Sequence, residues 1–65
     1  MNRTFIGVWT RGMMQEPSDV REFLEQWLAS TMIDDWFYAV EYKGKKYFIA
    51  DNGEFGYTAM LPDEY

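Results

Sequence analysis

The chain has 65 residues with a net charge of −5, from 11 acids against six bases, and it contains neither cysteine nor histidine. The missing thiol and imidazole exclude a disulfide framework, a thiolate or histidine metal site and the commonest general base of enzymes, while the acidity disfavours a protein that itself holds phosphates. We therefore expect one small acidic domain over residues 1–65 that is not an enzyme, holds no cofactor or metal, and contacts neither a membrane nor nucleic acid directly.

The first predicted element is a strand over residues 4–10, because this stretch is rich in β-branched and aromatic side chains. An amphipathic helix follows over residues 18–30, where apolar side chains recur at helical spacing. The positions that form this apolar stripe are Val20, Phe23, Leu24, Trp27 and Leu28. Pro17, Ser18 and Asp19 stand at its start in the order typical of a helix N-terminus, with the Ser18 hydroxyl as the expected cap.

Three further strands are predicted over residues 36–42, 46–51 and 54–59, joined by turns at Lys43-Gly44 and Asn52-Gly53. If both turns have two residues, the two hairpins agree in register, and one set of side chains lies on a single face of the sheet. This set comprises Phe37, Ala39, Phe48, Ala50, Phe55 and Tyr57. We therefore expect an α+β domain in the order βαβββ, with one amphipathic helix packed on this face of a small antiparallel sheet.

The opposite face of the predicted sheet is also rich in apolar side chains. It carries Trp36, Tyr38, Val40, Tyr42, Tyr47, Ile49 and Met60. Because one helix covers one side of a sheet, either the two faces are exchanged or an aromatic surface is left uncovered, and uncovered patches of this kind mark interaction sites. The candidate aromatic binding residues are Trp36, Tyr38, Tyr42 and Tyr47. Alternatively, the first strand, the C-terminal tail or a second copy in a homodimer covers this face.

Acidic side chains are the remaining candidates, since no serine has an imidazole to activate it and no glycine loop has phosphate-binding spacing. The adjacent Asp34 and Asp35 are typical of a solvated loop rather than of a catalytic or metal pair. Acids three and four residues apart on a helix lie about 5–6 Å from one another, comparable to the phosphates of a nucleic-acid backbone. The candidate partner-binding acids are Glu16, Asp19, Glu22, Glu25, Asp34, Asp35, Asp51 and Glu54. Such a row attracts a basic groove, although an ordinary solvated helix face has the same composition.

Three segments of the chain resemble the order of elements in ArdA-type antirestriction proteins. They are the strand Phe5-Ile6-Gly7-Val8-Trp9, the acidic helix that ends in Trp27-Leu28-Ala29-Ser30, and the run Tyr47-Phe48-Ile49-Ala50-Asp51 followed by Glu54-Phe55-Gly56. Members of that family are elongated acidic mimics of DNA, encoded by phages or plasmids, that occupy the DNA groove of type I restriction enzymes. The chain departs from the family in its length, which is that of one module, and in its basic segment Lys43-Gly44-Lys45-Lys46.

The resemblance implies a function and a set of residues that carry it. The positions that would replace DNA phosphates are Asp19, Glu22, Glu25, Asp51 and Glu54. The expected function is a small inhibitor of phage or mobile-element type that binds a host defence or nucleic-acid enzyme, of restriction or CRISPR type, in the cytoplasm of a bacterial host. The alternative is a structural or assembly module that self-associates through an exposed aromatic face of its sheet.

Overall fold

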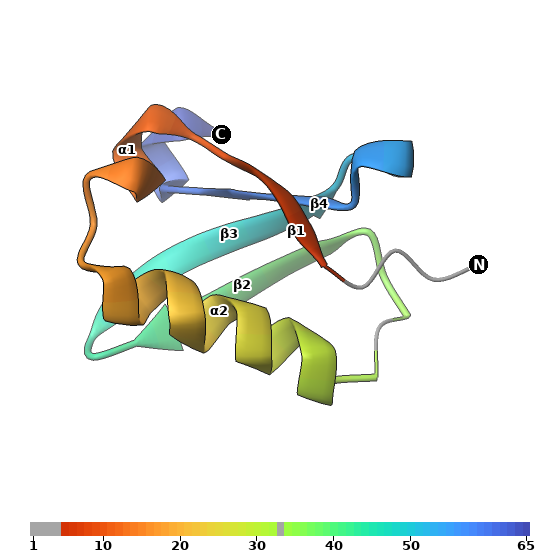
Figure 1. Cartoon of the computed structure of the whole chain (residues 1–65), viewed down its shortest axis with the longest axis horizontal. Coiled ribbons are helices and arrows are strands. Elements are labelled where there is room, and N and C mark those ends of the chain that lie inside the picture. Colours follow the sequence, from red (N-terminus) through yellow and green to blue (C-terminus); the bar gives the residue numbers. More distant parts are fainter. Residues whose placement is uncertain (1–4, 33) are drawn as a thin grey trace.

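The computed structural model describes residues 5–32 and 34–65. Along the chain it contains β1 (Ile6–Trp9), α1 (Arg11–Met14), α2 (Ser18–Ser30), β2 (Phe37–Tyr42), β3 (Lys45–Asp51), the 3-10 turn η1 (Gly53–Phe55), β4 (Tyr57–Met60) and the 3-10 turn η2 (Pro62–Glu64). The strands form one sheet in the order β1-β4-β3-β2, and α2 lies across one of its faces (Figure 1). The predicted α+β class is confirmed. The sheet is mixed and not antiparallel throughout, because β1 runs parallel to β4.

The first strand and the short helix after it depend on contacts with distant segments. β1 lies within the predicted strand 4–10, whose first position is outside the described residues. Gly7 lets β1 approach η1 closely, because a Cβ atom at this position would lie 1.7 Å from the carbonyl oxygen of Phe55. Helix α1 has no counterpart among the predicted elements. It is held by the fully buried side chain of Met13 and by Thr10, whose hydroxyl accepts a hydrogen bond from the Met13 amide.

Helix α2 begins and ends at the predicted residues, and its apolar stripe forms the centre of the core. Val20, Leu24 and Leu28 are buried against the sheet. The expected cap is wrong, because Pro17 occupies the N-cap position and the Ser18 hydroxyl makes no capping hydrogen bond. Among the described residues, no helix is long and apolar enough to cross a membrane.

The hairpin between β2 and β3 is confirmed residue by residue. Tyr42 pairs with Lys45, Ala39 with Phe48 and the other positions follow in the predicted register. The turn consists of Lys43 and Gly44, with φ angles of 53° and 79°. Positive φ at both central residues is what a tight hairpin requires, and glycine adopts it without steric cost.

The second predicted turn, at Asn52-Gly53, is wrong. The chain between β3 and β4 forms η1, and the Asn52 amide donates to the carbonyl of Gly56 (2.8 Å), so that Asp51 pairs with Tyr57 and not with Glu54. The Asp51 carboxylate accepts a hydrogen bond from the Gly53 amide (2.9 Å), which stabilises this longer turn. The shift of three residues exchanges the faces on which the side chains of β4 lie, because side chains alternate along a strand.

The two faces of the sheet are exchanged relative to the main prediction. The face under α2 carries Tyr38, Val40, Tyr42, Tyr47, Ile49, Tyr57 and Ala59. The predicted face instead points away from the helix, with two exceptions: the longer turn brings Tyr57 into the core, and Phe55 lies in η1 and not on a strand. Stacking between the layers explains the choice: Phe23 stacks on Tyr42 with ring centroids 4.2 Å apart, and Trp27 meets Tyr38 edge-on at 5.5 Å.

Candidate functional site

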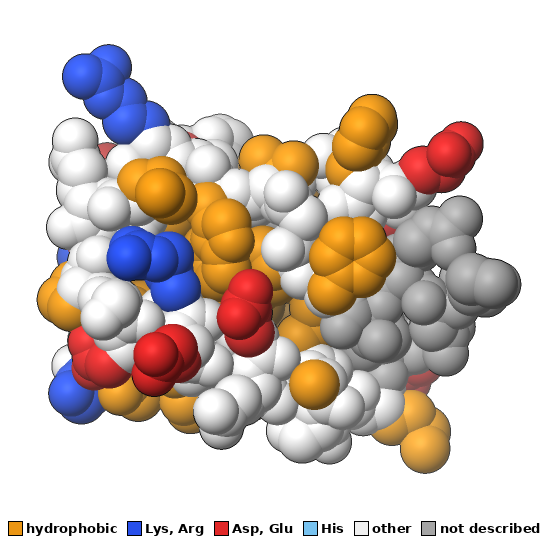
Figure 2. All heavy atoms as spheres, in the orientation of Figure 1, with side chains coloured by type: hydrophobic (Ala, Val, Ile, Leu, Met, Phe, Trp, Pro, Cys, Tyr) orange, Lys and Arg blue, Asp and Glu red, His pale blue; other side chains and the backbone are white. Residues whose placement is uncertain are grey.

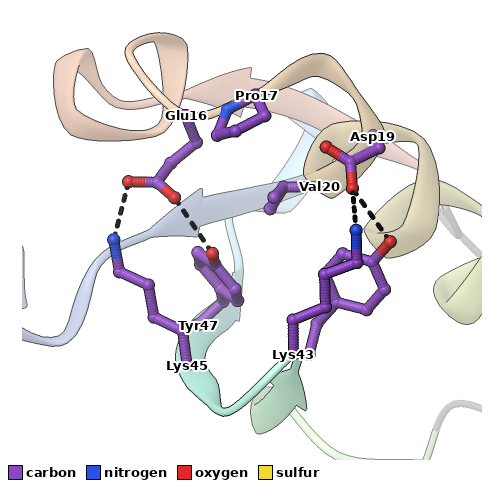
Figure 3. A pocket seen from close by; sticks show the side chains of 8 residues that line it. Glu16, Pro17, Asp19, Val20, Lys43, Lys45 and Tyr47 are labelled. Carbon is purple, nitrogen blue, oxygen red and sulfur yellow. Dashed lines mark hydrogen bonds and ion pairs between the residues drawn. The ribbon is translucent and has the colours of Figure 1, made fainter.

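Two of the predicted partner-binding acids are paired with lysines of the β2–β3 hairpin. Glu16 binds Lys45 Nζ at 2.8 Å and accepts a hydrogen bond from the Tyr47 hydroxyl at 3.0 Å. Asp19 binds Lys43 Nζ and the hydroxyl of Tyr42, both at 3.0 Å. Figure 3 shows these contacts on either side of a small pocket between the start of α2 and the hairpin.

The pairing changes the acidity of both carboxyl groups. The hydrogen bond from Lys45 lowers the pKa of Glu16, with a further contribution from Tyr47 and against the opposing effect of desolvation. The hydrogen bond from Lys43 lowers the pKa of Asp19 in the same way. Both groups are therefore ionised at neutral pH, but a lysine already compensates each charge. These two acids join α2 to the hairpin and are poor candidates for contact with a partner.

The other two predicted acids of α2, Glu22 and Glu25, are exposed on the outer side of the helix. Their spacing of about one helical turn places their Cβ atoms about 5–6 Å apart. The row expected along the helix is therefore shorter than predicted, because Asp19 turns towards the hairpin and leaves two acids on the outward face.

The remaining predicted acids come together at one end of the molecule, which we call the acidic end: Asp34, Asp35, Asp51 and Glu54. The segment before β2 and the turn after β3 meet there, since the Asp51 amide donates to the Trp36 carbonyl at 2.7 Å. All four acids are exposed. In Figure 1 this end includes the start of β2 and the turn between β3 and β4, on the right.

Neighbouring polar groups fix the backbone of the acidic end. The hydroxyl of Tyr38 accepts hydrogen bonds from the amides of Asp34 and Asp35, both at 2.8 Å, and donates to the Asp34 carboxylate at 3.1 Å. The Tyr57 hydroxyl donates to the carbonyl of Asp35 at 3.3 Å. The acids therefore project from a hydrogen-bonded frame built on the end of the sheet.

The bases of the described residues lie at the opposite end of the chain's fold. They belong to α1, the first half of α2 and the β2–β3 hairpin: Arg11, Arg21, Lys43, Lys45 and Lys46. Figure 2 shows coloured basic side chains at the left of the view, over these elements. Acids lie among these bases, because Glu16 and Asp19 pair with two of the lysines, whereas none of the bases of the described residues lies at the acidic end.

The predicted aromatic surface is wrong for most of its members. Tyr47 is buried with 2% of its surface exposed, and Tyr38 and Tyr42 are half-buried beneath α2. Trp36 is 58% exposed and lies beside the acidic end. The alternative that the two faces of the sheet are exchanged therefore holds, and the aromatic side chains of the helix face belong to the core.

The uncovered face of the sheet carries a ring cluster that includes Phe37 and Phe48, two side chains predicted to lie under the helix. Phe37 contacts Phe48 at a centroid distance of 5.0 Å, and Tyr65 contacts these two rings at 5.2 and 5.8 Å. Trp36 joins the cluster through Phe37 at 5.5 Å. Tyr65 is 70% exposed, so the cluster is open to solvent. The alternation of side chains along β2 and β3 predicts that Phe37 and Phe48 share a face, but it does not show which face the helix covers.

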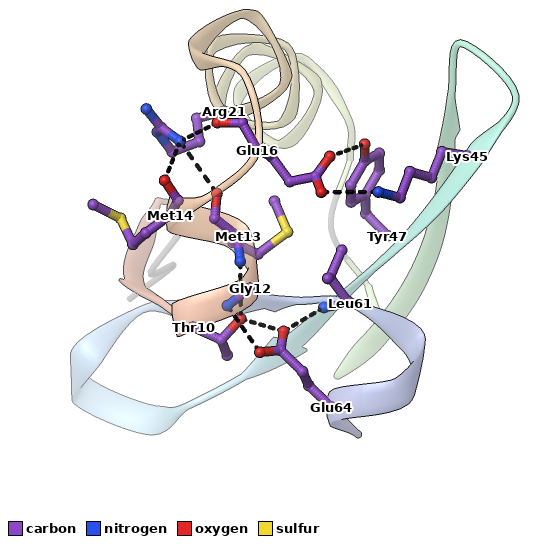
Figure 4. Close-up of polar contacts among 10 residues, drawn as sticks. All are labelled: Thr10, Gly12, Met13, Met14, Glu16, Arg21, Lys45, Tyr47, Leu61 and Glu64. Atoms are coloured by element: carbon purple, nitrogen blue, oxygen red, sulfur yellow. Dashed lines mark hydrogen bonds and ion pairs between the residues drawn. The ribbon is translucent and has the colours of Figure 1, made fainter.

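Two further polar groups were not identified from the sequence, and Figure 4 shows both. The Glu64 carboxylate accepts hydrogen bonds from the Thr10 hydroxyl and from the amides of Gly12 and Leu61, the last two at 2.9 Å, and these contacts lower its pKa. The Arg21 guanidinium donates to the carbonyls of Met13, Met14 and Glu16, at the end of α1. Both groups stabilise the helix termini of α1 and explain why so short a helix forms.

The described residues contain no cluster of three or more acids that could hold a metal ion. Comparisons of the chain with protein-family models, with curated proteins and with solved structures found no match in any of the three.

Proposed function

We propose that this protein is a small inhibitor, of the kind found in phages and mobile elements, that binds the basic nucleic-acid groove of a host defence enzyme through its acidic end. Asp34, Asp35, Asp51 and Glu54 take the place of backbone phosphates, and the exposed ring of Trp36 provides an apolar contact beside them. The observation that carries the proposal is that these four acids share an end of the fold where none of the bases of the described residues lies.

Physical chemistry supports this use of the acidic end. Exposed charges of one sign on a rigid frame steer an oppositely charged groove into contact, and the steering weakens as salt rises. A tryptophan next to the acids is the side-chain type that dominates the energetics of protein interfaces. Glu16 and Asp19 are set apart from the binding surface, because their charges are compensated within the chain.

A capture experiment with matched variants tests the proposal. The first variant carries Asp34→Asn, Asp35→Asn, Asp51→Asn and Glu54→Gln. It removes four charges, but Asn at 35 and 51 keeps the oxygen that accepts from the Trp36 and Gly53 amides. Each immobilised protein is incubated with bacterial lysate at about 0.05 M and about 0.5 M salt, conditions that differ strongly in screening, and retained proteins are identified by mass spectrometry.

The control variant removes four charges from other exposed positions, namely Glu22→Gln, Glu25→Gln, Glu41→Gln and Asp63→Asn. We expect the unaltered chain and the control variant to retain a nucleic-acid enzyme. High salt or added duplex DNA should release this enzyme. The acidic-end variant should retain much less of it. Equal retention by all three proteins would contradict the proposal, and loss in the control set alone would place binding on α2 or elsewhere instead of at the acidic end.

A further inference from the structure

The sheet face that points away from α2 has a regular composition along β2 and β3. The cross-strand partners on this face form three rows, which are Phe37 with Ala50, Ala39 with Phe48, and Glu41 with Lys46. Each of the first two rows joins a large ring to a methyl group, and the third joins an acid to a base. Ala39, Glu41 and Lys46 are exposed, and Phe37, Phe48 and Ala50 are half-buried.

This composition makes the face complementary to itself. A two-fold axis that lies in the interface, parallel to the strands and between β2 and β3, places β2 of one copy over β3 of the other at the same height. Phe37 then lies over the partner copy's alanine at 50, Ala39 over its phenylalanine at 48, and Glu41 over its lysine at 46. Rings meet methyl groups and acid meets base in all three rows, as an isologous interface requires.

We propose that a second copy of this chain docks on this face to form a two-fold symmetric dimer of face-to-face sheets. Aligned packing of two sheets about 10 Å apart accommodates interdigitated side chains of this size. Tyr65, which is 70% exposed at the end of the chain, rests on Phe37 and Phe48 in the single chain and swings aside in the dimer. The rings of Phe37 and Phe48 then lie at the interface, and Trp36, which precedes β2, stays outside the three rows.

The size of the face sets the strength of the dimer. With the axis between β2 and β3, only these two strands of each copy overlap, and strands about 4.8 Å apart and about 20 Å long give this overlap a footprint of roughly 200 Å². A stable interface buries about 800 Å² on each partner, so this dimer belongs to the weak class and forms in a concentration-dependent way. An axis parallel to the strands also places both acidic ends at the same end of the dimer, which would double the acids available for the proposed function.

Charge exchange between Glu41 and Lys46 gives the sharpest test. Dimers of Glu41→Lys bring two lysines together at each contact, and dimers of Lys46→Glu bring two glutamates together. An equimolar mixture restores both contacts, because the new lysine at 41 meets the new glutamate at 46 and the unaltered lysine meets the unaltered glutamate. The double variant restores them as well. Mixing cannot relieve the like-charge repulsion between positions 41 and 46 of the same chain. Recovery of association on mixing therefore shows that these positions meet between copies.

Sedimentation velocity at about 0.05 M salt, over about 10 µM to about 1 mM protein, measures the association. We expect the unaltered chain to dimerise, each single variant to associate about 10-fold more weakly, and the mixture to approach the unaltered affinity. A chain that stays monomeric over the whole range, or a mixture no stronger than its components, overturns the proposal. Either result leaves the proposed function untouched, because the measurement contains no other protein.

Ala39→Glu places a charge in the middle row and should abolish dimerisation without unfolding the chain, since Ala39 is exposed. The matched control is Ala29→Glu, the same change at an exposed position of α2. Circular dichroism confirms that both variants are folded. Dimerisation that survives in folded Ala39→Glu, or that is lost equally in Ala29→Glu, contradicts docking through this face.

Discussion

Replacing Tyr47 with phenylalanine tests the contact between the start of α2 and the β2–β3 hairpin most directly. The ring is almost completely buried, and its hydroxyl donates to the Glu16 carboxylate at 3.0 Å. Tyr47→Phe keeps the ring and removes this hydrogen bond. Glu16 retains its contact with Lys45 at 2.8 Å, so the carboxylate loses one of its two partners.

The expected loss of stability in Tyr47→Phe follows from the charge of the Glu16 carboxylate, which accepts the hydrogen bond. A hydrogen bond to a charged group contributes roughly 1.5–3 kcal/mol to stability. Because the Glu16 side chain is 14% exposed and water partly replaces the hydroxyl, we expect about 1–2 kcal/mol. For a domain of this size each kcal/mol lowers the melting temperature by about 4–8 °C, which predicts a decrease of roughly 4–16 °C at pH 7.

The pH dependence supplies a second criterion. The pKa of Glu16 is lowered in the folded chain, by Lys45 first and by Tyr47 in addition. Its stabilisation is therefore present above its ordinary value of 4.5 and is lost as the pH falls through the folded pKa. The difference between the unaltered chain and Tyr47→Phe should narrow below pH 4.5.

Thermal and urea unfolding of both proteins, followed by circular dichroism from about pH 3 to pH 7, measure these differences. Tyr65→Phe is the matched control, since it makes the same change on a ring that is 70% exposed. Equal stability of Tyr47→Phe and Tyr65→Phe at pH 7, or a difference that stays constant at low pH, would refute the role assigned to Tyr47 and Glu16.

Three further predictions concern the core and the approach of β1. Gly7→Ala should destabilise the domain by about 1–3 kcal/mol in urea unfolding, because its Cβ would lie 1.7 Å from the Phe55 carbonyl oxygen. Leu24→Ala should cost about 2–5 kcal/mol and leave little cooperative unfolding, since this side chain is fully buried. Burial raises the pKa of Tyr47 to about 12, so the unfolded chain releases this proton at lower pH than the folded chain. Stability should therefore fall between pH 10 and 12, and by less in Tyr47→Phe than in the unaltered chain.

The sequence predicts those parts of the fold that depend on local patterns. The apolar stripe fixes α2 from Ser18 to Ser30, and the glycine turn fixes the register of β2 and β3. The second turn was predicted wrongly because Asn52-Gly53 forms a tight turn only when nothing competes with it. Here the Asp51 carboxylate and the Gly56 carbonyl favour a longer turn. Because of this longer turn, the side chains of β4 lie on the opposite face from the one predicted. The two hairpins therefore do not place the predicted set of side chains on one common face.

The candidate site was less predictable, because it depends on which distant groups meet. No spacing in the sequence shows that Lys43 and Lys45 compensate Asp19 and Glu16, since this pairing requires the hairpin to fold back on the start of α2. The choice between the two sheet faces was open for the same reason. Both faces carry rings, and the decision rests on stacking with Phe23 and Trp27 of the helix.

Competition for a nucleic-acid groove tests the proposed function most directly. Fluorescence anisotropy of a labelled DNA duplex bound to a type I restriction enzyme is followed while this chain is added at low salt. We expect the chain to displace the duplex at near-stoichiometric amounts, and the variant with Asp34, Asp35, Asp51 and Glu54 neutralised to require far more protein. A duplex that stays bound at saturating amounts of the chain, or that both proteins displace equally well, would contradict mimicry of DNA by the acidic end.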